Sequence, residues 1–177
     1  MTTTQLQTTR DDHRIAWFTA LAITIHIAES ALPSPMPGVK PGLANVITIA
    51  VLVRFGWQTA VWVNLLRVLA GSLVIGTFLT PTFILSLSGA LASTVLLILL
   101  SHLPGQGCSA IGYSVASALI HIVTQFWVAY WLFIQHESFV WLLPLLLTAA
   151  LGFGLVTGII AQAMLEKLTE IEGSGKW

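Results

Sequence analysis

Long apolar runs, separated by short polar or proline-rich breaks, recur along the whole chain. They predict helices at about 15–32, 42–55, 57–79, 83–101, 109–134 and 139–165. About 20 consecutive apolar residues span the hydrocarbon core of a bilayer as a helix, and by this measure the second run is short. The pattern therefore predicts an all-α integral membrane protein. Its domain is a six-transmembrane-helix bundle over residues 15–165, with polar tails at 1–14 and 166–177.

The composition agrees with a lipid environment. Hydrophobic residues make up 56% of the 177-residue chain and charged residues only 8%, whereas soluble domains carry roughly a quarter charged residues. The net charge is zero and the chain has no basic cluster, which argues against nucleic acid as a partner. Cys108 is the single cysteine, which excludes an intramolecular disulfide and a multi-cysteine metal site.

Lysines and arginines near the helix ends predict the orientation, because cytoplasmic loops carry an excess of them. With six spans, one side holds Arg10, Arg14, Arg54, Lys167 and Lys176. The other side holds Lys40, and Arg67 lies within a span. Both termini are therefore predicted to be cytoplasmic. No small-residue cleavage pattern ends the first run, so we interpret it as a retained helix.

Small residues recur every four positions along the first predicted helix, at Ala16, Ala20, Thr24 and Ala28. Small side chains at this spacing let two helices approach closely in lipid. They indicate either packing within the bundle or a docking face for a partner membrane protein. Gly152, Gly154 and Gly158 form a similar small-residue series on the sixth predicted helix, where packing is the expected role.

Three groups of polar side chains interrupt the predicted spans, although such groups are costly inside a bilayer. The first pairs His26 with Glu29, and the second pairs Asn64 with Arg67, each three residues apart on one helix face. The third is a stripe on the fifth predicted helix, formed by Ser114, Ser117, His121 and Gln125. Separately, these groups are explained by a buried ion pair between Glu29 and Arg67 and by hydrogen bonds between helices.

One shared cavity, opening outward, explains all three groups together. Arg67 has a permanent charge and a planar donor fork suited to a carboxylate or phosphate. His121 and Gln125 can orient a polar head group. The segment PSPMPGVKPGLANV at 33–46, which includes Lys40, is either a rigid outer turn or a lid over this cavity.

Signatures of catalysis are missing from the sequence. A prenyl-elongating synthase needs acidic clusters that bind magnesium and diphosphate. The one adjacent acidic pair, Asp11 and Asp12, lies in the polar N-terminal tail. There is no Walker loop and no histidine spacing typical of a metal site. We therefore expect no catalytic residues, no metal, no cofactor and no catalytic activity of the chain by itself.

Four ordered motifs resemble one family. PGVKPGLANV followed by LLRVL resembles the PGxKxGLANxxT…R pattern of the Gx transporter family, also described as heptaprenyl diphosphate synthase component I. FILSLSGALAS, SAIGYSVASALIHIVTQ and LPLLLTAALGFGLVTG resemble the motifs of its fourth, fifth and sixth helices. The sequence departs from the family pattern at Pro41 and at Ile122, where an asparagine usually follows the histidine.

The family is also similar to the six-helix substrate-binding components of energy-coupling factor transporters. There, the loop after the first helix covers an outward pocket and alanines on that helix dock a coupling subunit. The resemblance implies a multi-pass protein of the bacterial cytoplasmic (inner) membrane. It carries over as candidate functional residues Glu29, Lys40, Asn45, Arg67, Ser86, Gly89, His121 and Gln125; the polar pattern adds Asn64 and Ser114 as substrate-binding residues.

Three functions follow as hypotheses. The first is a transport component that captures a small organic substrate with an anionic or polar group and is energised by a partner; the family description alone suggests an isoprenoid or quinone. The second is a membrane accessory subunit of a heptaprenyl or polyprenyl diphosphate synthase. The third is a stand-alone, proton-coupled carrier that uses Glu29 or His121.

Overall fold

The computed structural model describes residues 10–31, 42–102 and 108–173. Regular structure in these segments is entirely helical. The helices are α1 (Arg10–Ala31), α2 (Ala44–Phe55), α3 (Trp57–Ile75), α4 (Pro81–Ser101), α5 (Ala110–Ala129) and α6 (Leu143–Gly173). A π-helical turn, η1 (Tyr130–Ile134), extends α5, and a 3-10 helix, η2 (Glu137–Leu142), leads into α6.

Four of the helical segments are long and apolar enough to cross a membrane. They are α3, α4, α5 with η1, and η2 with α6. The apolar part of α1, Ile15–Glu29, and the whole of α2 are shorter. The all-helical fold is thus confirmed, and four of the six predicted spans are candidate membrane-spanning helices by length and composition.

Several helix ends differ from the predicted ranges, and α1 begins at Arg10, inside the predicted N-terminal tail. α3 stops at Ile75 because Gly76 takes a left-handed conformation (φ 76°) and Thr77 donates its N–H to the carbonyl of Ser72 at 2.8 Å. This C-terminal cap satisfies carbonyls that the helix leaves free. α6 runs past 165 to Gly173, so most of the predicted polar tail is helical. Good helix formers fill this stretch, and Gln162 donates to Glu166 one turn on, at 3.2 Å.

The short helix α2 lies at the centre of the bundle. It packs against α1, α3, α5 and α6, and its residues Ala44 and Val46 to Leu52 are all buried. A helix that is apolar on every side belongs in an interior. The predicted helix that was too short for a clear membrane span therefore forms the core of the fold.

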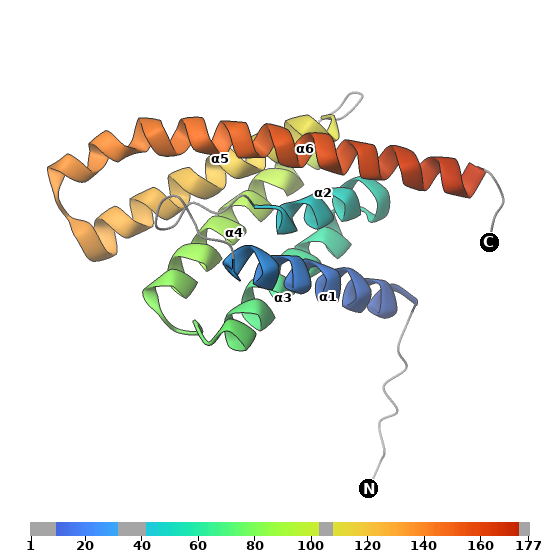
Figure 1. The fold of residues 1–177 in the computed structure, drawn as a ribbon, viewed down its shortest axis with the longest axis horizontal. Coiled ribbons are helices and arrows are strands. Elements are labelled where there is room, and N and C mark those ends of the chain that lie inside the picture. Colours follow the sequence, from blue (N-terminus) through green and yellow to red (C-terminus); the bar gives the residue numbers. More distant parts are fainter. Residues whose placement is uncertain (1–9, 32–41, 103–107, 174–177) are drawn as a thin grey trace, which may run out of the picture.

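The other helices surround α2. α3, α4, α5 and α6 pack in chain order, and α1 packs on α2 and α3. α5 and α6 form an antiparallel pair that reaches beyond the other helices at one end (Figure 1). α1 begins and α6 ends at the opposite end of the bundle (Figure 1).

Two glycines bring α5 and α6 close together. A Cβ added to Gly158 would lie 2.7 Å from the Cα of Ile111, and one added to Gly154 would lie 3.1 Å from the Cα of Val115. Gly152 has no atom within 4 Å of such a Cβ. The predicted packing role therefore holds for Gly154 and Gly158 and is wrong for Gly152.

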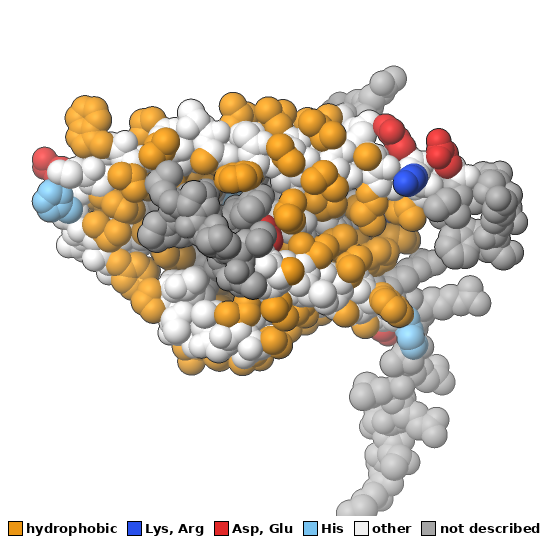
Figure 2. Space-filling model, in the orientation of Figure 1, with side chains coloured by type: hydrophobic (Ala, Val, Ile, Leu, Met, Phe, Trp, Pro, Cys, Tyr) orange, Lys and Arg blue, Asp and Glu red, His pale blue; other side chains and the backbone are white. Residues whose placement is uncertain are grey.

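The outer surface of the bundle is apolar. Large hydrophobic side chains are exposed on most helices, including Trp17 (78% exposed) and Trp141 (85%). Figure 2 shows hydrophobic side chains over the middle of the visible face and most charged side chains at its two ends. Such a surface suits lipid around the middle and water at the ends.

Candidate functional site

Both residues of the predicted pair on α3 are buried. Arg67 donates from an Nη atom to the Oδ1 of Asn64 at 2.7 Å. The amide nitrogen of Asn64 donates across to α4, to Thr94 Oγ1 at 2.7 Å and to the carbonyl of Ala90 at 3.3 Å. Asn64 therefore couples the guanidinium of Arg67 to the neighbouring helix.

Glu29 lies at the C-terminal end of α1 and is only 4% exposed. Its carboxylate accepts the backbone N–H of Leu43 at 2.7 Å and that of Ala44 at 3.4 Å. A carboxylate is stabilised at this position because the first N–H groups of a helix have no partner within it. Glu29 thus caps α2 across the 33–41 connection and also acts electrostatically on Arg67.

His121 on α5 lies against Gly89 on α4. A Cβ added to Gly89 would lie 2.9 Å from three atoms of the imidazole ring. The positive charge of Arg67 also acts on this imidazole. We group Glu29, Asn64, Arg67, Gly89 and His121 as the buried polar cluster; Glu29 and the half-buried His121 belong to it through their electrostatic interaction with Arg67. α1, α3, α4 and α5 each contribute a member.

Other candidates lie outside this cluster. Asn45 in the first turn of α2 donates to Ser117 Oγ on α5 at 3.1 Å. Ser114 is buried at the α5–α6 contact, where its Cβ would lie 3.0 Å from a Cβ on Gly158. Ser86 and Gln125 are half-buried, and Lys40 and most of the predicted lid lie outside the described residues. The structure therefore does not bring all the candidates to one place.

The four small residues of α1 all face outward. Ala16, Ala20, Thr24 and Ala28 are exposed, whereas Thr19, Ala22 and Glu29 are buried on the opposite face. Packing of this small-residue series inside the bundle, one of the two interpretations of the sequence, is therefore wrong.

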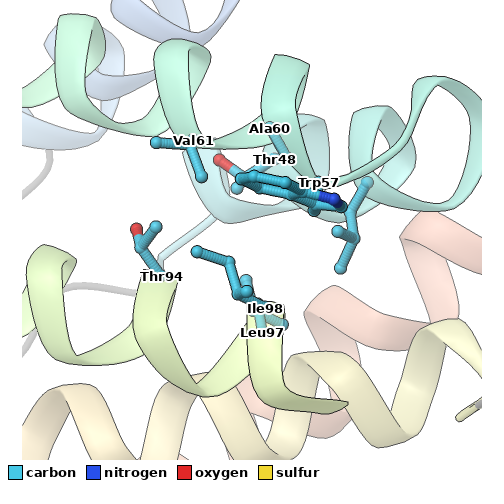
Figure 3. Close-up of a pocket in the computed structure, with 8 residues that line it drawn as sticks. Thr48, Trp57, Ala60, Val61, Thr94, Leu97 and Ile98 are labelled. Carbon is cyan, nitrogen blue, oxygen red and sulfur yellow. The ribbon is translucent and has the colours of Figure 1, made fainter. Parts of the chain in front are cut away.

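A small cavity lies between α2, α3 and α4. Its volume is about 10 Å³, and Figure 3 shows Thr94, Leu97 and Ile98 of α4 facing Thr48, Trp57, Ala60 and Val61. This is room for about one water molecule. The Oγ1 of Thr48 has no hydrogen-bond partner among the described residues, so this hydroxyl and that of Thr94 are suited to such a water. The cavity is too small for an organic ligand.

The buried polar cluster has unused capacity for hydrogen bonding. The Nε–H of Arg67 has no partner within the described part of the chain. The carboxylate of Glu29, which interacts electrostatically with Arg67, already accepts two N–H groups of α2. A buried charge needs paired partners to be tolerated, so an anionic group beside Arg67 would complete the cluster.

Comparison with known proteins decides the family. The family model described as heptaprenyl diphosphate synthase component I matches residues 18–164. The chain belongs to this family. The match covers the whole of α2 to α5, parts of α1 and α6, and every member of the buried polar cluster. No curated protein and no solved structure matches the chain.

In this component I family member, two hydroxyl side chains accept hydrogen bonds from candidate residues. The hydroxyl of Thr94 accepts a hydrogen bond from the side-chain amide of Asn64, and that of Ser117 accepts one from the side-chain amide of Asn45. Sequence reasoning missed Thr94 and named Ser117 only as part of the stripe on the fifth predicted helix. Thr94 directly follows the motif FILSLSGALAS on the predicted fourth helix, and this position was an available signal. Within the described segments, no three His, Cys, Asp or Glu side chains gather as a metal site would require.

Gly89→Ala is expected to destabilise this family member by about 1–3 kcal/mol, because the added methyl would overlap the His121 ring. In a His121→Ala background, the same change should have an effect near zero, since the ring is gone. Thermal unfolding midpoints of the four detergent-purified proteins measure this coupling. An equal penalty in both backgrounds would show that the ring does not determine the need for glycine.

Proposed function

We propose that this chain is the substrate-capturing component of a transport system in the bacterial cytoplasmic (inner) membrane. Its ligand is a small organic molecule with an anionic group, and a partner protein supplies the energy. The observation that carries this function is the guanidinium of Arg67, which is buried in the bundle with its Nε–H unpartnered among the described residues.

Burial of this charge is poorly explained by stability alone. Removing a guanidinium from water is costly, and apolar residues of similar volume usually serve a core at least as well. Asn64 accepts a hydrogen bond from one N–H of Arg67. The carboxylate of Glu29 is already hydrogen-bonded to a backbone N–H at the start of α2. A carboxylate or phosphate on the ligand would meet the remaining donors of the planar fork. Asn64 and His121 would then orient the bound group.

The outward-facing residues of α1 support a partner. The exposed side of α1 carries a stripe of small side chains, formed by Ala16, Ala20, Thr24 and Ala28. The Thr24 hydroxyl donates to the carbonyl of Ala20 at 2.9 Å, so even this polar group is satisfied within the helix. Close approach by a second helix gains van der Waals contact without leaving a polar group unpaired. We therefore assign these four residues to docking of a membrane partner.

Native mass spectrometry of the protein purified in a mild detergent tests the ligand assignment. The wild-type chain should retain a bound small molecule, and Arg67→Ala should lose it while still inserting in the membrane. Arg67→Lys should weaken retention, because an ammonium cannot make the paired contacts of a guanidinium. Arg54→Ala, which removes an exposed arginine at the C-terminal end of α2, is the matched control. Undiminished retention in Arg67→Ala would exclude Arg67 as the anchor.

A second function is favoured by the family description, which names a component of heptaprenyl diphosphate synthase. In that role, the chain would serve as a membrane accessory subunit, with catalysis in a separate protein. Co-purification with a prenyl diphosphate synthase, together with increased polyprenyl diphosphate output in reconstituted membranes, would favour it over transport. Ligand uptake into proteoliposomes that depends on an energising partner would favour the transport role.

A further inference from the structure

An open groove lies at the end of the bundle where α1 begins and α6 ends. Its volume is about 690 Å³. The C-terminal turns of α6, the start of α5 and the end of α2 line it. None of the residues of the buried polar cluster lines it.

The length of α6 and its charged last turns favour water around part of this groove. α6 has 31 residues, or about 46 Å at 1.5 Å per residue, whereas the hydrocarbon core of a bilayer is about 30 Å thick. The helix is therefore longer than the hydrocarbon is thick, and the charged side chains of Glu166, Lys167 and Glu170 favour its last turns as a part that lies in water. Gln162, Glu166, Thr169 and Glu170, which lie on these turns, all line the groove.

The floor of the groove is apolar. Ala110 belongs to the buried core and Leu165 packs against that core. Val53 at the end of α2 lies beside them and is half exposed. An apolar floor bordered by polar side chains at a water-facing end is typical of a protein interaction site.

The charges that line the groove are acidic. Glu166 and Glu170 lie one turn apart and are exposed near the C-terminus of α6. Like charges at this spacing repel each other, and the negative end of a helix dipole disfavours carboxylates. The N-terminus of α5 contributes a partial positive charge, but Ser109 Oγ already accepts the N–H of Gly112 there, at 3.2 Å. Lys167 and Arg54 neighbour lining residues in sequence but do not line the groove.

We propose that this groove docks a basic amphipathic segment of the partner protein, from a part of that protein that lies outside the bilayer. Lysine or arginine side chains of the segment would meet Glu166 and Glu170, and its apolar side chains would cover Val53, Ala110 and Leu165. The docked cations would relieve the repulsion between the two carboxylates. The inference deepens the proposed function, on which it rests for the existence of a partner, by assigning that partner a site and a charge.

Cys108 makes a direct test feasible, because it is the only cysteine of the chain and it lines the groove. We would attach an environment-sensitive fluorophore to Cys108 in the full-length protein, held in phosphatidylcholine nanodiscs. The probe is a synthetic 14-residue helical peptide with leucines on one face and lysines four residues apart on the other. A peptide of the same composition with scrambled order is its control. The ordered peptide should change the fluorescence saturably, and more strongly than the scrambled one.

The double variant Glu166→Gln/Glu170→Gln should weaken binding of the ordered peptide by about tenfold, since two exposed charge pairs contribute up to roughly 1 kcal/mol each. Glu137→Gln removes one charge at the opposite end of the bundle and should leave the affinity unchanged. Raising the salt concentration should weaken wild-type binding more than binding by the double variant.

Three results would overturn the docking site. One is equal affinity of the wild type and the double variant for the peptide. Another is a saturable response to MgCl₂ alone, beyond that of NaCl at equal ionic strength, which would indicate a cation site. The third is concentration-dependent dimerisation that buries the fluorophore, which would make a second copy the occupant. Ligand retention, measured on the same samples, distinguishes failure of the docking site from failure of the Arg67 ligand site. A protein that loses peptide binding but still retains its ligand would contradict only the docking site.

Discussion

Gly158→Ala is expected to destabilise the bundle by about 3 kcal/mol, which is the first of the two largest effects we predict. The new Cβ would lie 2.7 Å from the Cα of Ile111. Because that atom belongs to backbone and not to a flexible side chain, α5 and α6 would have to separate. α5 and α6 make the most extensive helix pair of the bundle, so the shift would propagate. The free energy of reversible unfolding in SDS, supported by the thermal midpoint, measures the loss.

Gly152→Ala is the matched control for this change. It lies on the same helix, is exposed, and has no atom within 4 Å of an added Cβ. Alanine is favoured over glycine within a helix by about 0.5–1 kcal/mol, so this variant should be slightly more stable than wild type. If both variants behaved alike, close packing at Gly158 would not be what holds α5 against α6.

Glu29→Ala is the second large effect, with an expected loss of about 3–5 kcal/mol. The substitution removes the acceptor of the Leu43 and Ala44 N–H groups and the negative charge that acts on Arg67. Glu29→Gln should lose less, about 1–3 kcal/mol, because one amide oxygen can still accept an N–H. The same SDS unfolding measurement applies.

A double-mutant cycle separates the two roles of Glu29. If its charge on Arg67 matters, Glu29→Ala combined with Arg67→Met should lose less stability than the sum of the single changes. If only the cap on α2 matters, the losses should add. Wild-type stability in Glu29→Ala would show that neither role contributes.

The sequence predicted the helical content of the fold well, because lipid leaves few other ways to satisfy backbone groups. Helical spacing alone was also enough to place Asn64 and Arg67 on one face, as their hydrogen bond confirms. These predictions depend only on residues close together in the sequence, whose relative positions are fixed by the geometry of the α-helix.

Contacts between helices were much less predictable. The spacing of His26 and Glu29 shows a shared face, but it cannot show that Glu29 reaches the N-terminus of α2 or that the His26 ring packs on Gly71. The stripe on α5 was predicted as one surface, yet its members diverge. Ser114 faces α6, Ser117 meets α2, and His121 meets α4. When a helix is surrounded by several other helices, each of its residues can contact a different neighbouring helix. The packing of the bundle, and not the spacing of the residues, decides which helix that is.

The enclosure of α2 has a consequence for how the protein is made. A helix of 12 residues is about 18 Å long, too short to be held across a bilayer by its own length. Its buried surface is supplied by α1 and α3, and also by α5 and α6, which leave the ribosome later. We expect the second helix to gain its final place only after the last two have been synthesised. α2 would then be the last helix to be fully enclosed, although it is the second to be synthesised. A chain truncated before Ala110 lacks α5 and α6, so its α2 should stay exposed and the chain should be degraded.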